Sequence, residues 1–180
     1  MRTKTNQNGR SMIEMLGVLA IIGVLSVGGI AGYSKAMQKY RTNKTIEQIT
    51  LIANGVRTLY SGQRNYQGVN MRVIQKAKIL PESAFDGSSS AANAYGTTPF
   101  GGNIGIFSGG DYKTFDIELY QVPEDICIEL LSQDWGEGMV NYGVRGSIIS
   151  STTMTIDNAI TACEAHTRST LPEALQFSFK

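Results

Sequence analysis

The longest feature of the hydropathy pattern is an uncharged run of twenty residues, Met15 to Ser34, which lies between Glu14 and Lys35. At a rise of about 1.5 Å per residue, a helix of this length matches the roughly 30 Å hydrocarbon core of a bilayer. The run therefore predicts a helix that can span a membrane. It also leaves the carboxylate of Glu14 at the edge of apolar surroundings, where an unpaired charge is costly.

Beyond Lys35 the helical pattern continues and becomes amphipathic. Apolar residues recur at steps of three and four along one stripe, formed by Ile46, Ile49, Ala53, Val56 and Tyr60. Polar residues such as Thr45 and Gln48 are expected elsewhere around the helix. The pattern predicts that this half covers the core of a globular domain. The helix should end between Tyr60 and Gly62, with Gly62 as a left-handed cap.

The rest of the chain alternates between strand and short-helix patterns. Strands are predicted over residues 114–120, 139–144, 147–156 and 175–179. Short helices are predicted from Pro123 onward and over residues 157–166, the second with Asp157 as its N-cap. Residues 81–111 are rich in Gly, Ser and Asn, which predicts an irregular surface loop suited to contacts between molecules. The predicted fold class is α+β, a long N-terminal helix packed on an antiparallel sheet with short helices.

Composition adds little to this picture except at the N-terminus. The 180 residues include 16 basic and 15 acidic side chains, for a net charge of +1. No global field would steer such a protein onto nucleic acid, so no nucleic-acid partner is expected. Residues 1–10 are an exception, because they carry three basic side chains and no acid.

Two cysteines, Cys127 and Cys163, are 36 positions apart and form no compact metal motif with His166, the single histidine. In a reducing compartment they would be buried thiols, whereas in an exported protein the default is one disulfide. A catalytic Cys–His pair would need a reduced, activated thiol. We therefore expect no enzyme, no cofactor and no metal site.

Two general interpretations of the N-terminus fit poorly. A cleavable secretory signal has an apolar stretch of about 7 to 15 residues, shorter than the run found here. A plain membrane anchor with Arg2, Lys4 and Arg10 on the cytoplasmic side fits the charges, but it gives Glu14 no role.

A third interpretation rests on the order of the residues. Gly9 ends the basic leader, Arg10 follows it, and Ser-Met-Ile-Glu then leads into the apolar run, so that Glu14 is the fifth residue after Gly9. This arrangement resembles the class III signal of type IV pilins and pseudopilins. The resemblance implies cleavage between Gly9 and Arg10 by a prepilin peptidase and N-methylation of Arg10. It also implies an ion pair between Glu14 and the N-terminal amine of a neighbouring subunit.

The same resemblance implies a domain organisation and a place in the cell. Residues 1–9 would be a leader that is removed, residues 10–61 a helix that spans the membrane before assembly and forms the filament core afterwards, and residues 62–180 a globular head. A C-terminal loop closed by Cys127 and Cys163 is a pilin feature, and the non-aromatic first mature residue favours the type IVb branch. The precursor would lie in the bacterial inner membrane, and the product would be an extracellular pilus.

The expected partners are other copies of the chain, the prepilin peptidase and the inner-membrane assembly machinery. Gly28 and Gly32 form a GxxxG pattern that permits close helix packing. Two alternatives remain at this stage. One is a minor pilin or a secretion pseudopilin, and the other is a membrane-anchored binding domain that never polymerises.

Overall fold

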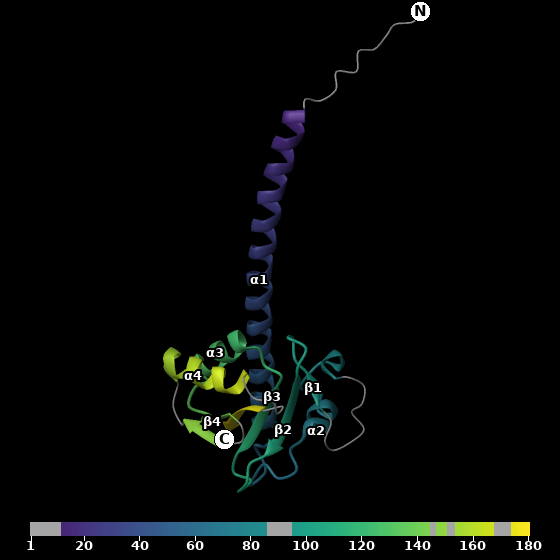
Figure 1. Cartoon of the computed structure of the whole chain (residues 1–180). Coiled ribbons are helices and arrows are strands. Elements are labelled where there is room, and N and C mark those ends of the chain that lie inside the picture. The colour runs from purple at the N-terminus through teal and green to yellow at the C-terminus, as the bar shows by residue number, and fades with distance from the viewer. Residues whose placement is uncertain (1–11, 86–94, 145–146, 151–153, 168–173) are drawn as a thin grey trace, which may run out of the picture. The chain divides into compact units, whose positions relative to one another are not determined.

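The computed structural model describes residues 12–85, 95–144, 147–150, 154–167 and 174–180. The chain divides into two compact units, Met1–Lys39 and Tyr40–Lys180, and we call the second unit the head. The boundary falls within the first helix, so the last turns of this helix belong to the head. The elements in chain order are α1 (Met12–Tyr60), α2 (Met71–Lys76), η1 (Glu82–Ala84), β1 (Gly96–Thr97), β2 (Asn103–Ser108), β3 (Phe115–Tyr120), α3 (Glu124–Ser132), β4 (Met139–Val144), β5 (Ser147–Ser150), α4 (Ile156–Thr167) and β6 (Ala174–Phe179) (Figure 1).

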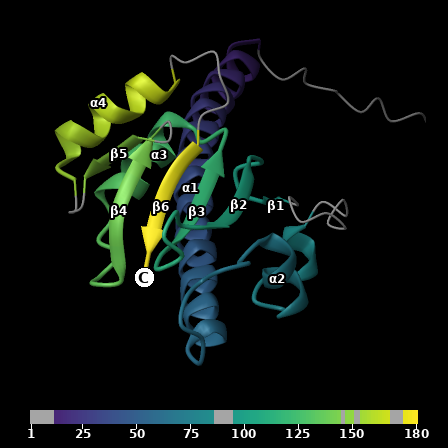
Figure 2. The ribbon, with the colours of Figure 1, turned by 90° about the horizontal axis from the view of Figure 1, so that it is seen from below.

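The head is built on one six-stranded sheet with the order β1-β2-β3-β6-β4-β5. Every neighbouring pair of strands is antiparallel, as expected. The strand that comes last in the chain, β6, lies between β3 and β4, which Figure 2 shows from below. The sheet is therefore joined at its centre by residues 174–179.

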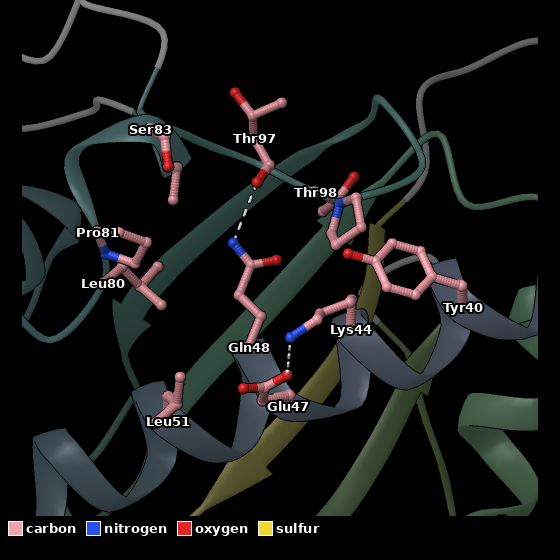
Figure 3. Close-up of a pocket in the computed structure, with 12 residues that line it drawn as sticks. Tyr40, Lys44, Glu47, Gln48, Leu51, Leu80, Pro81, Ser83, Thr97 and Thr98 are labelled. Atoms are coloured by element: carbon pink, nitrogen blue, oxygen red, sulfur yellow. Dashed lines mark hydrogen bonds and ion pairs between the residues drawn. The ribbon is translucent and has the colours of Figure 1, made fainter. Parts of the chain in front are cut away.

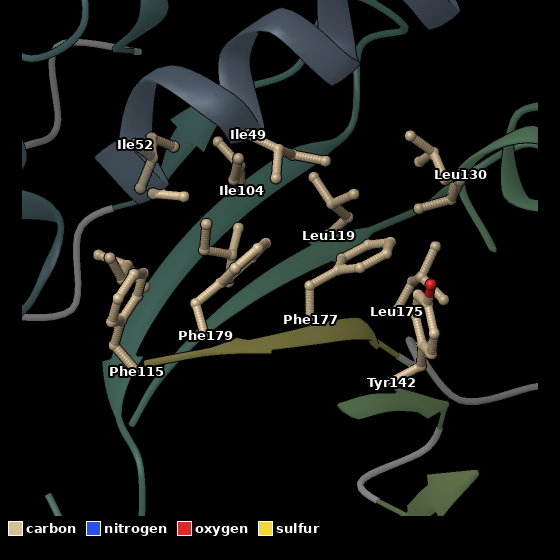
Figure 4. Packing of buried hydrophobic residues seen from close by; sticks show 14 of the residues in the cluster. Ile49, Ile52, Ile104, Phe115, Leu119, Leu130, Tyr142, Leu175, Phe177 and Phe179 are labelled. Carbon is tan, nitrogen blue, oxygen red and sulfur yellow. The ribbon is translucent and has the colours of Figure 1, made fainter. Parts of the chain in front are cut away.

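Apolar and polar residues alternate along the strands, so the sheet has one apolar face and one polar face. On the apolar face, Phe115, Ile117 and Leu119 of β3 lie opposite Phe179, Phe177 and Leu175 of β6. All six side chains are buried, and they pack with Ile49 and Ile52 of α1 and Leu130 of α3 (Figure 4). On the polar face, the Ser178 hydroxyl donates a hydrogen bond to the Asp116 carboxylate. Burial of the apolar face on α1 and α3 forms the core of the head.

The buried face of α1 is wider than the apolar stripe in the sequence. Its buried residues are Thr42, Thr45, Gln48, Ile49, Ile52, Ala53, Val56 and Tyr60. The expectation that Thr45 and Gln48 lie off this face was wrong. Both side chains can be buried because their donors are satisfied: Thr45 Oγ1 bonds to the Arg41 carbonyl oxygen at 2.9 Å, and Gln48 Nε2 bonds to the Thr97 carbonyl oxygen at 3.0 Å.

Helix α1 ends at Tyr60, as expected, but Gly62 is not in the left-handed region and does not cap it. The chain leaves the helix through a turn instead. The Ser61 hydroxyl donates to the Thr58 carbonyl oxygen at 2.9 Å, and Gln63 N donates to the Tyr60 carbonyl oxygen at 2.8 Å. These bonds satisfy carbonyl groups that the end of a helix leaves free.

The prediction of an irregular loop over residues 81–111 was wrong in part. This stretch holds η1, β1 and the six-residue strand β2. Ile104 and Ile106 face the core from β2 and lie opposite Leu119 and Ile117 of β3. Because a glycine separates the two isoleucines, the alternation of apolar and polar residues that is typical of a strand is hard to recognise in the sequence. Packing of both isoleucines against the neighbouring strand stabilises the strand.

The boundary between β5 and α4 also differs from the expectation. Strand β5 ends at Ser150, and α4 begins at Ile156, so the predicted strand over 147–156 was too long. Asp157 lies inside the first turn and is not the N-cap. Thr155 takes that role, because its hydroxyl accepts from Asn158 N at 3.4 Å and its carbonyl from Ala159 N at 3.0 Å.

Arg57 ties the end of α1 to the end of β6. Its Nε donates to the Lys180 carbonyl oxygen at 2.8 Å, and its guanidinium lies 5.4 Å from the centre of the Phe179 ring. Gly138 lets the guanidinium approach this closely, since a Cβ at that position would lie 1.8 Å from Arg57 Nη2. A side chain at position 138 would therefore displace Arg57.

Candidate assembly site

The first half of α1 is apolar, and its described residues are exposed. Its large side chains are exposed, with Met12 at 83%, Val24 at 75% and Val27 at 72%. The helix is long and apolar enough near the N-terminus to cross a membrane, and none of that stretch is buried. So much exposed apolar surface needs a lipid or protein partner.

Glu14 lies in the first turn of α1, in this exposed apolar stretch. An acid in the first turn is favoured by the helix dipole. Gly9 and Arg10, where cleavage and methylation are expected, lie outside the described residues. The predicted pairing of Glu14 with a new N-terminal amine thus stays a prediction.

Gly28 and Gly32 lie one turn apart on α1. A Cβ added at either position would meet no atom within 4 Å outside the helix's own turns. Nothing in the described part of the chain therefore requires glycine at these positions. Their expected role, close approach of a second helix, stays a prediction as well.

Cys127 of α3 and Cys163 of α4 form a disulfide, with their Cα atoms 5.9 Å apart. Both residues are fully buried in the core of the head. The bond closes a segment that contains β4 and β5 and holds α4 against α3. The disulfide removes the thiols that a Cys–His catalytic pair would need.

A pocket in the head was not foreseen. It has a volume of about 440 Å³ and is lined by three segments: α1 with Tyr40, Gln48 and Leu51, the turn before η1 with Leu80, and the β1 region with Thr98 (Figure 3). The segments are far apart in the chain, so no local pattern in the sequence indicates the pocket. The nearest sequence signal is Gln48, a polar residue beside the buried stripe of α1.

The polar atoms of Gln48 are unequally satisfied. Nε2 donates to the Thr97 carbonyl oxygen, whereas Oε1 is buried and accepts no hydrogen bond from any residue that the structure describes. In Figure 3 this oxygen turns away from Thr97, toward the side of the pocket where Thr98 and Tyr40 lie. At the rim, Lys44 and Glu47 form an exposed ion pair at 2.6 Å.

Solved structures of two type IV pilins are similar to this fold. The type IV b pilin from Salmonella typhi matches with a TM-score of 0.55 and 16% identity, over 75% of this chain and 96% of that chain. TcpA, a type IV pilin from the Vibrio cholerae El Tor biotype, matches with a TM-score of 0.51 and 16% identity, over 78% of this chain and 99% of that chain. With its exposed apolar helix and its disulfide-closed head, the molecule has the architecture of a type IV pilin.

The family is shown by sequence. A family model described as Bundlin matches residues 34–180, and the chain belongs to this family. The major structural subunit of the bundle-forming pilus of Escherichia coli O127:H6 (strain E2348/69 / EPEC) is 25% identical over 177 residues, which span 89% of this chain and 90% of the relative. The subunit from Escherichia coli O111:H- matches to the same extent. The chain is thus a type IV pilin of the IVb branch, a structural protein and not an enzyme.

Proposed function

We propose that this chain is a prepilin of the inner membrane whose leader, residues 1–9, is removed by a prepilin peptidase. The mature chain, which begins at Arg10, then polymerises through α1 into an extracellular pilus. The inner-membrane assembly machinery drives this step. Membership of a family whose relatives are major pilus subunits supports the polymerisation.

The observation that carries the proposal is the exposed apolar half of α1. Its side chains are compatible with lipid, and equally with the same helix of other copies. One surface therefore serves both states, which is what a subunit that leaves the membrane for a filament requires. Outside the cell, the alternative to helix packing is exposure of the apolar surface to water. Burial of this surface between subunits therefore stabilises the filament by about 25 cal/mol per Å².

Glu14 and the new N-terminus supply the register of assembly in this proposal. Cleavage after Gly9 creates an α-ammonium at Arg10. A carboxylate among apolar side chains is far less costly when it is paired than when it is alone. Glu14 of one subunit therefore pairs with the amine of a neighbour, and that amine is N-methylated.

Gly28 and Gly32 suit the same packing. Without side chains they allow two helices to approach closely, and each glycine also weakens the helix interior by about 1 kcal/mol. The apolar half of α1 is therefore adapted to close contact and to local loosening within a filament.

Intact-mass measurement on sheared filaments tests the cleavage. We expect a chain that begins at Arg10, heavier by one methyl group than the unmodified residues 10–180. A chain that still begins at Met1 and stays monomeric in the membrane would contradict the proposal and favour a membrane-anchored binding domain. Filaments in trace amounts would favour a minor pilin or a pseudopilin.

Replacement of Glu14 by glutamine tests the pairing, because it removes the charge and keeps the shape. We expect Glu14→Gln to enter the membrane normally and to form few or no filaments. Glu124→Gln, at an exposed acid of the head, is the matched control and should assemble as the unchanged chain does. Normal filament yield from Glu14→Gln would remove the ion pair from the proposal.

A further inference from the structure

The pocket on α1 has an unmet hydrogen-bonding requirement. Gln48 is 7% exposed, and no described residue donates a hydrogen bond to its buried Oε1, which in Figure 3 points toward the side of the pocket where Thr98 and Tyr40 lie. A buried carbonyl oxygen without a donor costs about 1 to 3 kcal/mol. Most of the remaining lining is apolar, including Leu51 and Leu80. An occupant that suits the pocket combines an apolar body with one hydrogen-bond donor at its tip.

The head itself presents such a group at Tyr112. Among the described residues of the head, the large hydrophobic side chains that are exposed are Tyr40, Leu51, Leu59, Tyr112, Ile156 and Ile160. Only the two tyrosines carry a hydroxyl donor, and Tyr40 already lines the pocket. Tyr112, which is 44% exposed, is the remaining group with an apolar ring and a donor.

The loop that carries Tyr112 is held in place by backbone hydrogen bonds. Tyr112 N donates to the Gly109 carbonyl oxygen, and Gly109 N donates to the Thr114 carbonyl oxygen, both at 2.9 Å. Tyr112 has φ of 59°, a left-handed conformation that non-glycine residues adopt only where surrounding contacts enforce it. The ring is therefore presented from a fixed backbone, which lowers the entropy cost of binding.

The pocket and the Tyr112 loop lie toward opposite ends of the head's part of α1. The loop is next to the end of the helix, because the Tyr112 carbonyl oxygen accepts from Tyr66 N at 2.8 Å and the Tyr66 ring lies 5.6 Å from that of Tyr60. Gln48 precedes Tyr60 by twelve residues, which is about 18 Å along the axis. Tyr112 is thus directed to another molecule, and a contact between two different surfaces propagates instead of closing a pair.

From these observations we propose that the pocket receives Tyr112 of a second copy of this chain, and that the Tyr112 hydroxyl donates to Gln48 Oε1. The proposal rests on the proposed polymerisation and names a head-to-tail contact within the filament. Tyr40, which is 57% exposed, and Lys44, whose ion pair is exposed, turn aside to admit the ring. Their displacement costs little, since exposed ion pairs contribute about 0 to 1 kcal/mol.

Cross-linking within filaments tests the contact. Leu51→Cys places a thiol at the pocket, and Lys113→Cys places one beside Tyr112 while keeping the tyrosine. Treated with a short bismaleimide, filaments of the double variant should give a ladder of dimers, trimers and longer products. Filaments mixed from the two single variants should give dimers and nothing longer, because each chain then has one reactive end.

The matched control is the pair Leu59→Cys and Lys113→Cys. Leu59 lies on the same helix and is 44% exposed, against 46% for Leu51, but it is outside the pocket. If filaments form and the Leu51 pair cross-links no more than the Leu59 pair, the contact is wrong while polymerisation stands. If the unchanged chain forms no filaments, the proposed function is what fails.

A second variant tests the contact if the cysteine substitutions prevent filament assembly. Tyr112→Ala leaves the backbone bond from Tyr66 N in place, since that bond uses the main chain. We expect it to lower the fraction of chains that pellet as filaments by about tenfold, which is about 1.4 kcal/mol. Leu59→Ala should have no such effect. Equal pelleting of the Tyr112→Ala and unchanged chains would overturn the proposal.

Discussion

Tyr120 is a partly buried residue whose ionisation is coupled to the fold of the head. Its hydroxyl donates to the Glu118 carboxylate, and its ring meets the Tyr95 ring edge-on at 5.4 Å. Burial, and then the hydrogen bond to Glu118, raise the pKa of Tyr120 far above its usual value. Burial also raises the pKa of Tyr60. Both phenols therefore stay protonated in the folded head.

These shifts predict a loss of stability in alkali. A tyrosine with a raised pKa contributes stability that is fully present below its unfolded pKa of about 10 and is lost as the pH rises beyond it, because the unfolded chain releases the proton first. The free energy of unfolding in urea, measured in detergent from pH 8 to 11.5 in about half-unit steps, should fall above about pH 10. Tyr120→Phe should make that fall shallower, and an equally steep fall in this variant would show that other groups cause it.

At the residue scale, the sequence was least informative about buried polar side chains whose donor group forms a hydrogen bond within the protein. Thr45 bonds within α1, and Gln48 bonds to a carbonyl oxygen 49 positions away. The first bond is local, but nothing in the sequence indicates that the side chain is buried. The second depends on where β1 packs. Glu14, Gly28 and Gly32 are different, because their expected partners belong to other molecules and the isolated chain offers no test of them.

At the scale of elements, clean alternation was a reliable guide. Strands β3, β4 and β6 lie within one residue of the segments predicted for them, and helix α3 begins one residue after Pro123, where a short helix was predicted to start. Strand β2 was missed because glycine and asparagine surround Ile104 and Ile106 and outweigh an alternation of only two apolar residues. Its stability comes from pairing with β3, which is a tertiary effect and is not encoded in the local composition.

The central strand β6 is where a single substitution should be most damaging. Phe177 is fully buried and packs against the rings of Trp135 at 5.3 Å and Tyr142 at 5.8 Å. Phe177→Ala should lower the free energy of unfolding by about 3 to 5 kcal/mol, because the cavity it leaves adds to the lost burial. Urea titration of the full chain in detergent measures this change.

Gln176→Ala is the control for this prediction. Gln176 is the neighbouring residue of β6, so its side chain lies on the other face of the sheet, and it is only half-buried. Its substitution should change the free energy of unfolding by less than about 1 kcal/mol. Similar losses from both variants would mean that strand pairing dominates over the packing of Phe177.

At the scale of the whole molecule, the disulfide contributes to the free energy of unfolding of the head. It joins residues 36 positions apart, and closing a loop of this length stabilises the folded state by about 3 to 4 kcal/mol in the chain-entropy model. The double variant Cys127→Ala/Cys163→Ala should therefore unfold roughly 10 °C below the unchanged chain. Thermal unfolding followed by circular dichroism measures the difference, and a reducing agent should lower the midpoint only for the unchanged chain.

The class of the whole molecule was more predictable than its details. The order of Gly9, Arg10, Glu14 and the apolar run indicated a type IV pilin, and the family match confirms that class. The pocket on α1 was not predictable in the same way. It exists only because α1, the turn before η1 and the β1 region converge in the folded head.

The position of β6 has a consequence for the timing of biosynthesis. Residues 174–179 come late in synthesis, yet they join β3 to β4 at the centre of the sheet. Until they have been synthesised, β3 cannot be joined to β4, and the other described strands can form no more than two separate sheet fragments with open edges. Helix α1 is complete after the first sixty residues. In the proposed function this helix is the membrane anchor, so it is available long before the sheet closes. In the proposed pathway anchoring therefore precedes folding of the head, and the order of the elements along the chain is also the order in which they act.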